Sequence, residues 1–240
     1  MRRSVIFGVS ALATVVASLA VAPLESLAVG HPIALPSPSG LIKNSLANAE
    51  NSRAVHEVAM TSSGGQHLTM TNDIGTSEGR QVVSFTDGAQ AEILGFVAAK
   101  HAYFEGNKMA LQQYFGFTSK QSGTYANKWM SVTPKNAGWQ PLTQSITLAS
   151  DFSSNVVIQH PTIAKKTQKI DGVTCWVISG NLVNTSTRET AKVTLYVSDA
   201  KTPLPVQFNL AAGATTTTVK WTQWGESLTF VAPTHSVPAP

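Results

Sequence analysis

The chain has 240 residues and a formal net charge of +4, and its scattered basic residues exclude the continuous basic surface that a nucleic-acid backbone requires. Charged residues make up only 12% of the sequence, so Thr, Ser, Asn and Gln supply much of the polar surface, as is common in exported β-proteins. The single cysteine, Cys175, excludes an internal disulfide, and its surrounding sequence VTCWVIS predicts a buried strand position rather than a nucleophile.

The first 28 residues predict a secretory signal peptide. Arg2 and Arg3 give a positively charged start, residues 5–22 form an uncharged run of apolar and small residues, and Ser26-Leu27-Ala28 offers small residues where a signal peptidase cleaves. We expect cleavage there and a soluble, exported chain, located outside the cell or in its envelope. The alternative is an uncleaved N-terminal membrane anchor, because the run approaches the length that crosses a bilayer.

A linker and a helix should follow the signal. Residues 29–40 are rich in Pro, Ser and Gly and predict the linker. The helix should have Ser39 as its N-cap and Ile42, Leu46 and Ala49 on its apolar side. The apolar period then changes to two, which indicates strands separated by Gly-Gly and Asp-Gly turns. The expected strands cover residues 55–61, 68–71, 81–86, 91–99 and 101–104.

The middle of the chain is less regular and predicts a helix at residues 109–117 and a strand at 129–132. A second amphipathic helix should begin near Pro141 and carry Leu142, Ile146 and Ala149. The last third returns to strands, expected at residues 165–170, 173–179, 189–197, 205–210, 215–223 and 228–231. One domain should therefore span residues 41–233, and the Pro-rich residues 234–240 should form a disordered tail.

Strands that are joined by short turns pair antiparallel, because parallel neighbours need long crossover connections. With only two or three helices, the predicted fold class is α+β, with one large antiparallel sheet and helices over one of its faces. Such a sheet, curved around its helices, forms an apolar trough.

The sequence carries no recognised catalytic signature. It has no G-x-S-x-G elbow, no H-E-x-x-H, no P-loop and no G-x-G-x-x-G. Its six histidines are far apart and include no i, i+4 pair that would bind a metal. We therefore expect no enzyme activity, no catalytic residue, no metal site and no cofactor.

Apolar side chains are the remaining candidates for function. Core packing is the default explanation for each of them, but a cavity for an apolar ligand uses the same residue types. Val83 and Phe85 share one face of their strand, and Leu94 and Phe96 share one face of the next. The candidate cavity-lining residues are Val83, Phe85, Leu94, Phe96, Tyr103 and Trp129.

Four stretches carry a resemblance to a known family. Residues 192–208 read KVTLYVSDAKTPLPVQF, a strand, an Asp-bearing turn and a Leu-Pro step into a second strand. Residues 219–233 read VKWTQWGESLTFVAP, with a Trp-Gly break. AYFEGN at 102–107 and NKWMSV at 127–132 flank a predicted helix. In this order, and after an N-terminal helix that leads into a strand, they resemble the LolA-like superfamily, especially its actinobacterial lipoprotein branch of the LppX and LprG type.

The resemblance implies a half-open β-barrel with helices on its concave side, and non-covalent transport of lipids or lipidated molecules across the cell envelope. The lipoproteins of that branch carry a lipid-modified cysteine after the signal, and this chain has none there. The resemblance therefore extends to the fold but not to membrane tethering, and it brings no catalytic residues.

Two functions remain open beside a third, a secreted hydrolase with no recognisable motif, which the missing catalytic signatures disfavour. The first is a secreted or envelope carrier that binds a lipid or other apolar ligand in the trough, with the outer face of a membrane as a transient partner. The second is an envelope sensor or interaction module that regulates another protein. Fold analogy alone does not decide between them.

Overall fold

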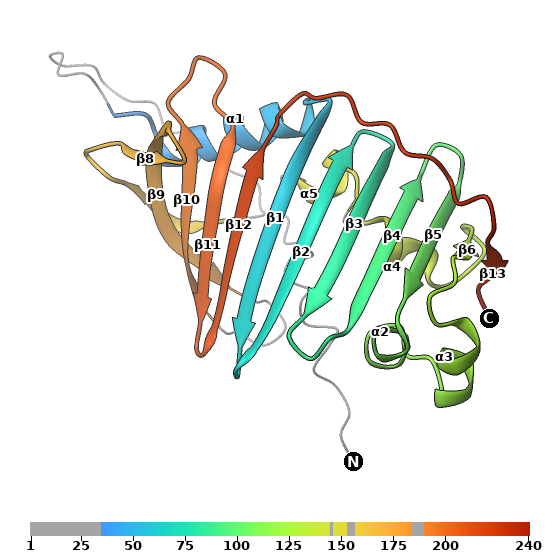
Figure 1. Ribbon diagram of the computed structural model, residues 1–240. Helices are drawn as coiled ribbons and strands as arrows, with labels where there is room; N and C mark the ends of the chain where they lie inside the picture. Colours follow the sequence, from blue (N-terminus) through green and yellow to red (C-terminus); the bar gives the residue numbers. More distant parts are fainter. Residues whose placement is uncertain (1–34, 145, 153–156, 184–189) are drawn as a thin grey trace, which may run out of the picture.

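The computed structural model describes residues 35–144, 146–152, 157–183 and 190–240 (Figure 1). The signal peptide expected at residues 1–28 lies outside the described residues, as does the first half of the expected linker, residues 29–34.

Thirteen strands of the described chain form one curved sheet with the order β13-β6-β5-β4-β3-β2-β1-β12-β11-β10-β9-β7, and β8 pairs beside β9 (Figure 1). Neighbouring strands pair antiparallel except β13 and β6, which are parallel. The predicted α+β class and its large antiparallel sheet are thus confirmed. The strands are β1 (Ala54–Ser63), β2 (Gln66–Gly75), β3 (Glu78–Phe85), β4 (Gln90–Phe96), β5 (His101–Gly106), β6 (Met130–Val132), β7 (Gln159–Ile163), β8 (Gln168–Ile170), β9 (Val173–Val183), β10 (Thr190–Ser198), β11 (Pro205–Ala212), β12 (Thr215–Thr222) and β13 (Val237–Pro238).

Tight turns fix the register of this sheet. Gly64 and Gly65 join β1 to β2 and both have a positive φ, of 56° and 82°. Two such residues in succession form the turn that matches the twist of a two-residue hairpin. The pairing then runs without a break from Ser63 opposite Gln66 to Ala54 opposite Gly75. Because side chains alternate between faces, this register decides which residues of each strand face the helices.

The helices are α1 (Pro38–Glu50), α2 (Lys108–Gln113), α3 (Ser119–Tyr125), α4 (Trp139–Thr143) and α5 (Leu148–Asp151). The structure corrects the start of the first one. Its N-cap is Ser37, whose Oγ accepts a hydrogen bond from the Gly40 amide at 3.4 Å, and not Ser39. Pro38 suits the first helical position, because it has no N–H to leave unpaired. The helix therefore includes the last three residues of the expected linker.

The single helix expected to carry Leu142, Ile146 and Ala149 is also wrong. Two short helices replace it, with Ile146 in the connection between them. The reason is long-range: Thr147 has an extended backbone (φ −128°, ψ 141°) and forms a parallel bridge to Gly75 of β2. Pairing with the sheet thus interrupts the helix that the local apolar periodicity predicts.

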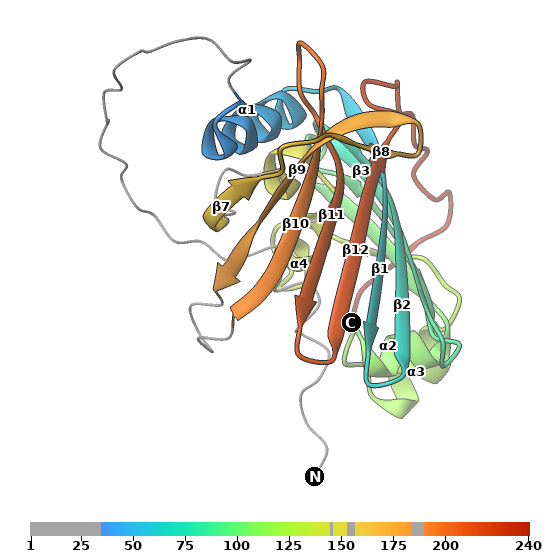
Figure 2. The same ribbon diagram turned by 90° about the vertical axis from the view of Figure 1, so that its left-hand side faces the viewer.

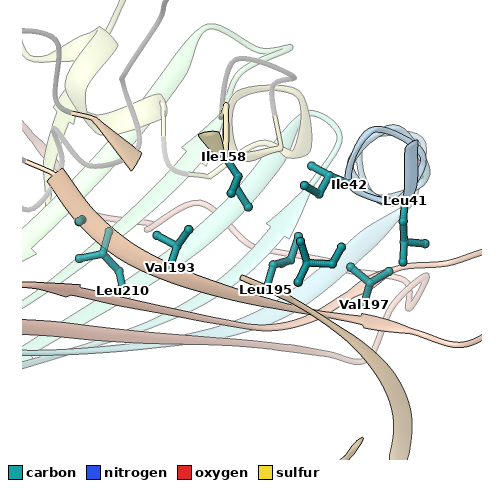
Figure 3. Packing of buried hydrophobic residues seen from close by; sticks show 9 residues of the cluster. Leu41, Ile42, Ile158, Val193, Leu195, Val197 and Leu210 are labelled. Atoms are coloured by element: carbon teal, nitrogen blue, oxygen red, sulfur yellow. The ribbon is translucent and has the colours of Figure 1, made fainter. Parts of the chain in front are cut away.

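α1 lies on one side of the sheet, across β9, β10 and β11 (Figure 2). Leu41 and Ile42 point from α1 toward the strands (Figure 3), where they pack against buried side chains such as Leu195 and Val197 of β10. A second buried cluster joins Leu111 of α2 to the face of β4, β5 and β6. The helix-covered face is called the concave face below, and the other the convex face.

The C-terminal residues also differ from expectation. No strand forms at residues 228–231, because both edges of β12 are already paired, with β1 and β11. The chain instead runs past the ends of β1 to β5 and reaches the free edge of β6 (Figure 1). There the Val237 amide donates to the Trp129 carbonyl at 3.0 Å and the Ala239 amide to the Ser131 carbonyl at 3.1 Å. Residues 237–239 of the expected disordered tail thus pair with the edge of the sheet.

Candidate ligand-binding surface

The concave face can be followed across the sheet from one residue. Val55 of β1 packs in the same buried cluster as Ala49 of α1 and Leu148 of α5. Every second residue of β1 therefore faces the helices: Val55, Glu57, Ala59 and Thr61. Their partners in the register extend each position into a row that crosses the neighbouring strands.

One of these rows is apolar and incompletely covered. Ala59 lies opposite Val219 of β12 on one side and Met70 of β2 on the other. The row continues to Phe208 of β11 and to Val83 of β3. Apart from the buried Ala59, these side chains are only half-buried. We call Phe208, Val219, Ala59, Met70 and Val83 the apolar strip. It crosses five adjacent strands, which at about 4.8 Å per strand gives a length of roughly 19 Å.

The next row along the strands is polar and buried. Glu57, Asn72 and Gln81 lie side by side on β1, β2 and β3, with exposures of only 5%, 2% and 7%. Trp221 of β12 lies opposite Glu57 on the other side. We call Trp221, Glu57, Asn72 and Gln81 the polar row. Because alternate residues of a strand are about 6.8 Å apart, the polar row adjoins the apolar strip along its whole length.

Glu57 is the centre of a hydrogen-bond network. Its Oε1 accepts from Asn72 Nδ2 at 2.6 Å and its Oε2 from Trp221 Nε1 at 2.8 Å. Asp151 of α5 provides a third hydrogen bond to this carboxyl group. Burial raises the pKa of Glu57, while the bonds from Trp221 and Asn72 partly counter that rise. The hydrogen-bonded pair of Glu57 and Asp151 therefore connects the sheet to α5, a helix that packs against α1.

Burial, reinforced by the charge of Glu57, raises the pKa of Asp151 well above its ordinary value. Two carboxyl groups in contact cannot both ionise cheaply, so the pair retains a proton. Because the pKa of Asp151 is the one raised well above its ordinary value, Asp151 is the expected donor of the hydrogen bond between the two groups, and Glu57 then has donors on three sides.

One buried atom in the polar row lacks a partner. Among the described residues, Asn72 Oδ1 accepts no hydrogen bond, although the Nδ2 of the same side chain donates to Glu57. Buried polar atoms nearly always have a partner, so an orphan of this kind needs a physical explanation.

The predicted cavity-lining residues are divided between the two faces. Val83 belongs to the apolar strip, and Phe85 faces the same side, where its ring stacks on that of Tyr114 at 3.8 Å. Leu94, Phe96 and Tyr103 point to the convex face: Leu94 pairs with Tyr103, and the rings of Phe96 and Tyr103 meet edge to face at 6.0 Å.

The parity of β4 explains this division. Val83 lies opposite Ala91, so the concave residues of β4 are Ala91, Ile93 and Gly95, and Leu94 and Phe96 necessarily face away. Trp129 immediately precedes β6, and its carbonyl accepts the hydrogen bond from the C-terminal tail. These six residues are thus not one constellation.

The sequence reasoning missed most of the strip and all of the polar row. Met70, Val219 and Phe208 occupy every second position of predicted strands, so their alternation was visible in the sequence. Glu57 and Gln81 lie on predicted strands and Asn72 directly follows one, and a polar residue at an expected core position was the signal that could have identified the first two.

Two hollows are clear in the described part of the chain, and neither includes a residue of the strip. One, of about 270 Å³, lies on the convex side between β3, β4 and β5 and contains Glu92 and Glu105. The other, of about 190 Å³, lies at the end of β2 and β3 beside Glu226 and Leu228. Both are lined largely by polar residues.

Two further findings concern the chemistry of the surface. Within residues 35–144, 146–152, 157–183 and 190–240, no group of three or more His, Cys, Asp or Glu side chains could hold a metal ion. Over the same residues, each helix is too short or too polar to cross a lipid bilayer.

Comparison with solved structures identifies proteins of the same fold. LprF from Mycobacterium bovis is 17% identical, with a TM-score of 0.50, over 82% of this chain and 98% of its own. The lipoprotein LppX of Mycobacterium tuberculosis is 14% identical, with a TM-score of 0.51, over 80% of this chain and 99% of its own. At the level of sequence, neither a family model nor a curated protein matches. The predicted resemblance to the LppX and LprG type is thus confirmed as a likeness of fold.

Proposed function

We propose that this protein is an exported, non-enzymatic carrier that binds a lipid or other apolar ligand non-covalently on the apolar strip. The observation that carries the proposal is the incomplete coverage of the strip. Four large apolar side chains, on β11, β12, β2 and β3, are only partly buried on the concave face, although helices cover the same face on either side. A continuous apolar surface of this kind is typical of a binding site.

The dimensions of the strip suit an acyl chain. A chain that lies across five strands would contact a continuous row of apolar side chains about 19 Å long. Each methylene that leaves water gains about 0.8 kcal/mol, before the cost of association is subtracted. Affinity should therefore rise with chain length and level off when the strip is fully covered.

The likeness to LprF and to the lipoprotein LppX supports the proposal at the level of fold. The N-terminal 28 residues support export, with cleavage at Ser26-Leu27-Ala28 and the cell envelope or exterior as the place of action. The donor or acceptor of such a ligand would be the outer face of a membrane, contacted transiently.

The test compares two methionines on adjacent strands that face opposite sides. Met70 belongs to the strip, while Met60 of β1 faces the convex side and is 46% exposed. Purified, delipidated protein is titrated with a neutral, polarity-sensitive dye, and native mass spectrometry counts the bound molecules. We expect one dye per chain, weakened severalfold by Met70→Gln and unchanged by Met60→Gln.

Saturable binding absent from folded, delipidated protein would refute the carrier function. Equal effects of the two substitutions would show that the dye binds elsewhere. In either case the interaction-module function would become the better explanation of the fold.

A further inference from the structure

Apolar residues could take over any role that the polar row has in holding the fold together. The opposing faces of the helices and sheet pack through aliphatic clusters, yet Glu57, Asn72 and Gln81 interrupt them on three central strands. Burying a carboxylate costs free energy even when it is hydrogen-bonded, and well-packed apolar residues are often at least as stabilising. The position of the row, directly beside the apolar strip, suggests that it serves whatever lies on the strip.

The free hydrogen-bonding capacity of the row is that of an acceptor. The Glu57 carboxylate already has donors from Asn72, Trp221 and Asp151. The Asn72 Oδ1 has none among the described residues, and it is buried. A ligand group that donates a hydrogen bond would therefore satisfy this atom, whereas a group that only accepts would leave it unpaired.

The charge of the row acts in the same direction. Glu57 and Asp151 place two carboxyl groups in contact in a buried setting, and no Lys or Arg side chain among the described residues offsets their charge through an ion pair. An anionic end group brought to the row would meet this charge at low dielectric, where repulsion is strong.

We propose that the polar row selects the end group of the ligand, and that the preferred ligand is an uncharged lipid with a hydrogen-bond donor such as a hydroxyl group. The apolar chain lies on the strip, and the donor reaches Asn72 Oδ1 from the adjoining row. Lipids with an anionic end group are disfavoured by Glu57. This inference rests on the proposed carrier function and adds the chemical class of the ligand to it.

The test uses three probes with the same chain length: tetradecanol, methyl tetradecanoate and tetradecanoate. The first is a neutral donor, the second is neutral without a donor, and the third is an anion at neutral pH. Each displaces the neutral dye from the wild-type protein. We expect tetradecanol to bind roughly tenfold more tightly than the methyl ester, as one satisfied acceptor implies, and tetradecanoate to bind more weakly than tetradecanol.

Two variants separate the donor effect from the charge effect. Asn72→Leu removes the acceptor and should abolish the preference for the alcohol over the ester. Glu57→Gln removes the charge and should narrow the gap between the alcohol and tetradecanoate. Met60→Gln, on the convex face, should leave all three affinities as they are. Circular dichroism confirms the fold of each variant, and if Asn72→Leu does not fold, the wild-type comparison and Glu57→Gln still decide.

The outcomes distinguish this inference from the function on which it rests. Failure of the dye itself to bind would refute both. Dye binding with equal displacement by all three probes would refute the selection of an end group while leaving the carrier function intact. Equal affinity for the alcohol and the ester would show that Asn72 Oδ1 does not recognise the ligand, and would overturn the proposal in the same way.

Discussion

Ile146 lies between α4 and α5, is fully buried, and packs against two glycines that are neighbours on the concave face. Gly79 and Gly95 pair with each other across β3 and β4. A Cβ at Gly95 would overlap Ile146 Cδ1 and lie 3.1 Å from Cγ1. A Cβ at Gly79 would instead overlap the carbonyl oxygen of Ile146 and lie 2.9 Å from its Cβ. Because neither glycine has a side chain, the segment between α4 and α5 can pack directly on the sheet.

The difference between the two contacts predicts a specific pattern of double mutants. Gly95→Ala should cost about 2 kcal/mol through overpacking, and Ile146→Val about 1 kcal/mol through the lost methyl group. Valine lacks the Cδ1 atom that a new methyl at position 95 would overlap. The free energy of unfolding of the double variant should therefore fall by only about 1–1.5 kcal/mol, whereas the two single effects add up to about 3 kcal/mol.

Gly79→Ala provides the matched comparison. Its clash is with backbone and Cβ atoms that Ile146→Val retains, so the two effects should add. Urea unfolding, followed by tryptophan fluorescence, measures the wild type, the three single variants and the two double variants. For a domain of this size, 1 kcal/mol corresponds to about 2–4 °C in Tm, so thermal unfolding provides a second reading. Additive losses in the Gly95 pair, or coupling in the Gly79 pair, would show that Ile146 does not pack on the sheet as described.

Two shorter predictions concern buried titratable groups. The unfolded chain releases the Asp151 proton near the ordinary Asp pKa, whereas the folded chain retains it to higher pH because its pKa is raised. The free energy of unfolding should therefore fall as the pH rises between these two pKa values, by at most about 1.4 kcal/mol per pH unit. Asp151→Asn removes this titration and should flatten the profile measured from about pH 4 to about pH 9; an unchanged slope would place the proton elsewhere. Cys175 is a buried free thiol whose pKa is raised by burial, so Cys175→Ala should cost on the order of 1 kcal/mol and leave dye binding unchanged, and a loss of binding at unchanged stability would contradict a purely structural role.

The turns, and the strands between them, could be predicted from the sequence because nearby residues determine them. The turns at Gly64-Gly65, Asp87-Gly88 and Asp171-Gly172 were each identified from the residues that accept a positive φ, and Gly65, Gly88 and Gly172 have one. Strands β1 to β5 and β9 to β12 follow because alternation between turns requires them. Cys175 is buried on β9, as its sequence predicts.

Long-range pairing determined the parts that were missed. The bridge from Gly75 to Thr147 divides the expected second helix, and the edge of β6 recruits Val237 from more than a hundred residues away. Neither partner is visible in the local sequence. A Pro-rich tail reads as disordered from composition, yet a free strand edge can pair even a two-residue segment.

The six candidate residues are divided between the two faces of the sheet because they were chosen by size. Leu94 and Phe96 were selected as large apolar side chains, but the concave positions of β4 are Ala91, Ile93 and Gly95. Position 95 requires a glycine because Ile146 packs directly on it. Leu94 and Phe96 lie on the other face, where that constraint does not apply. The proposed binding surface lies where Phe208, Val219, Met70 and Val83 are incompletely covered, and three of these four residues are on strands other than β3 and β4. The binding surface thus follows from register and coverage together, and neither can be derived from the apolar pattern of a single strand.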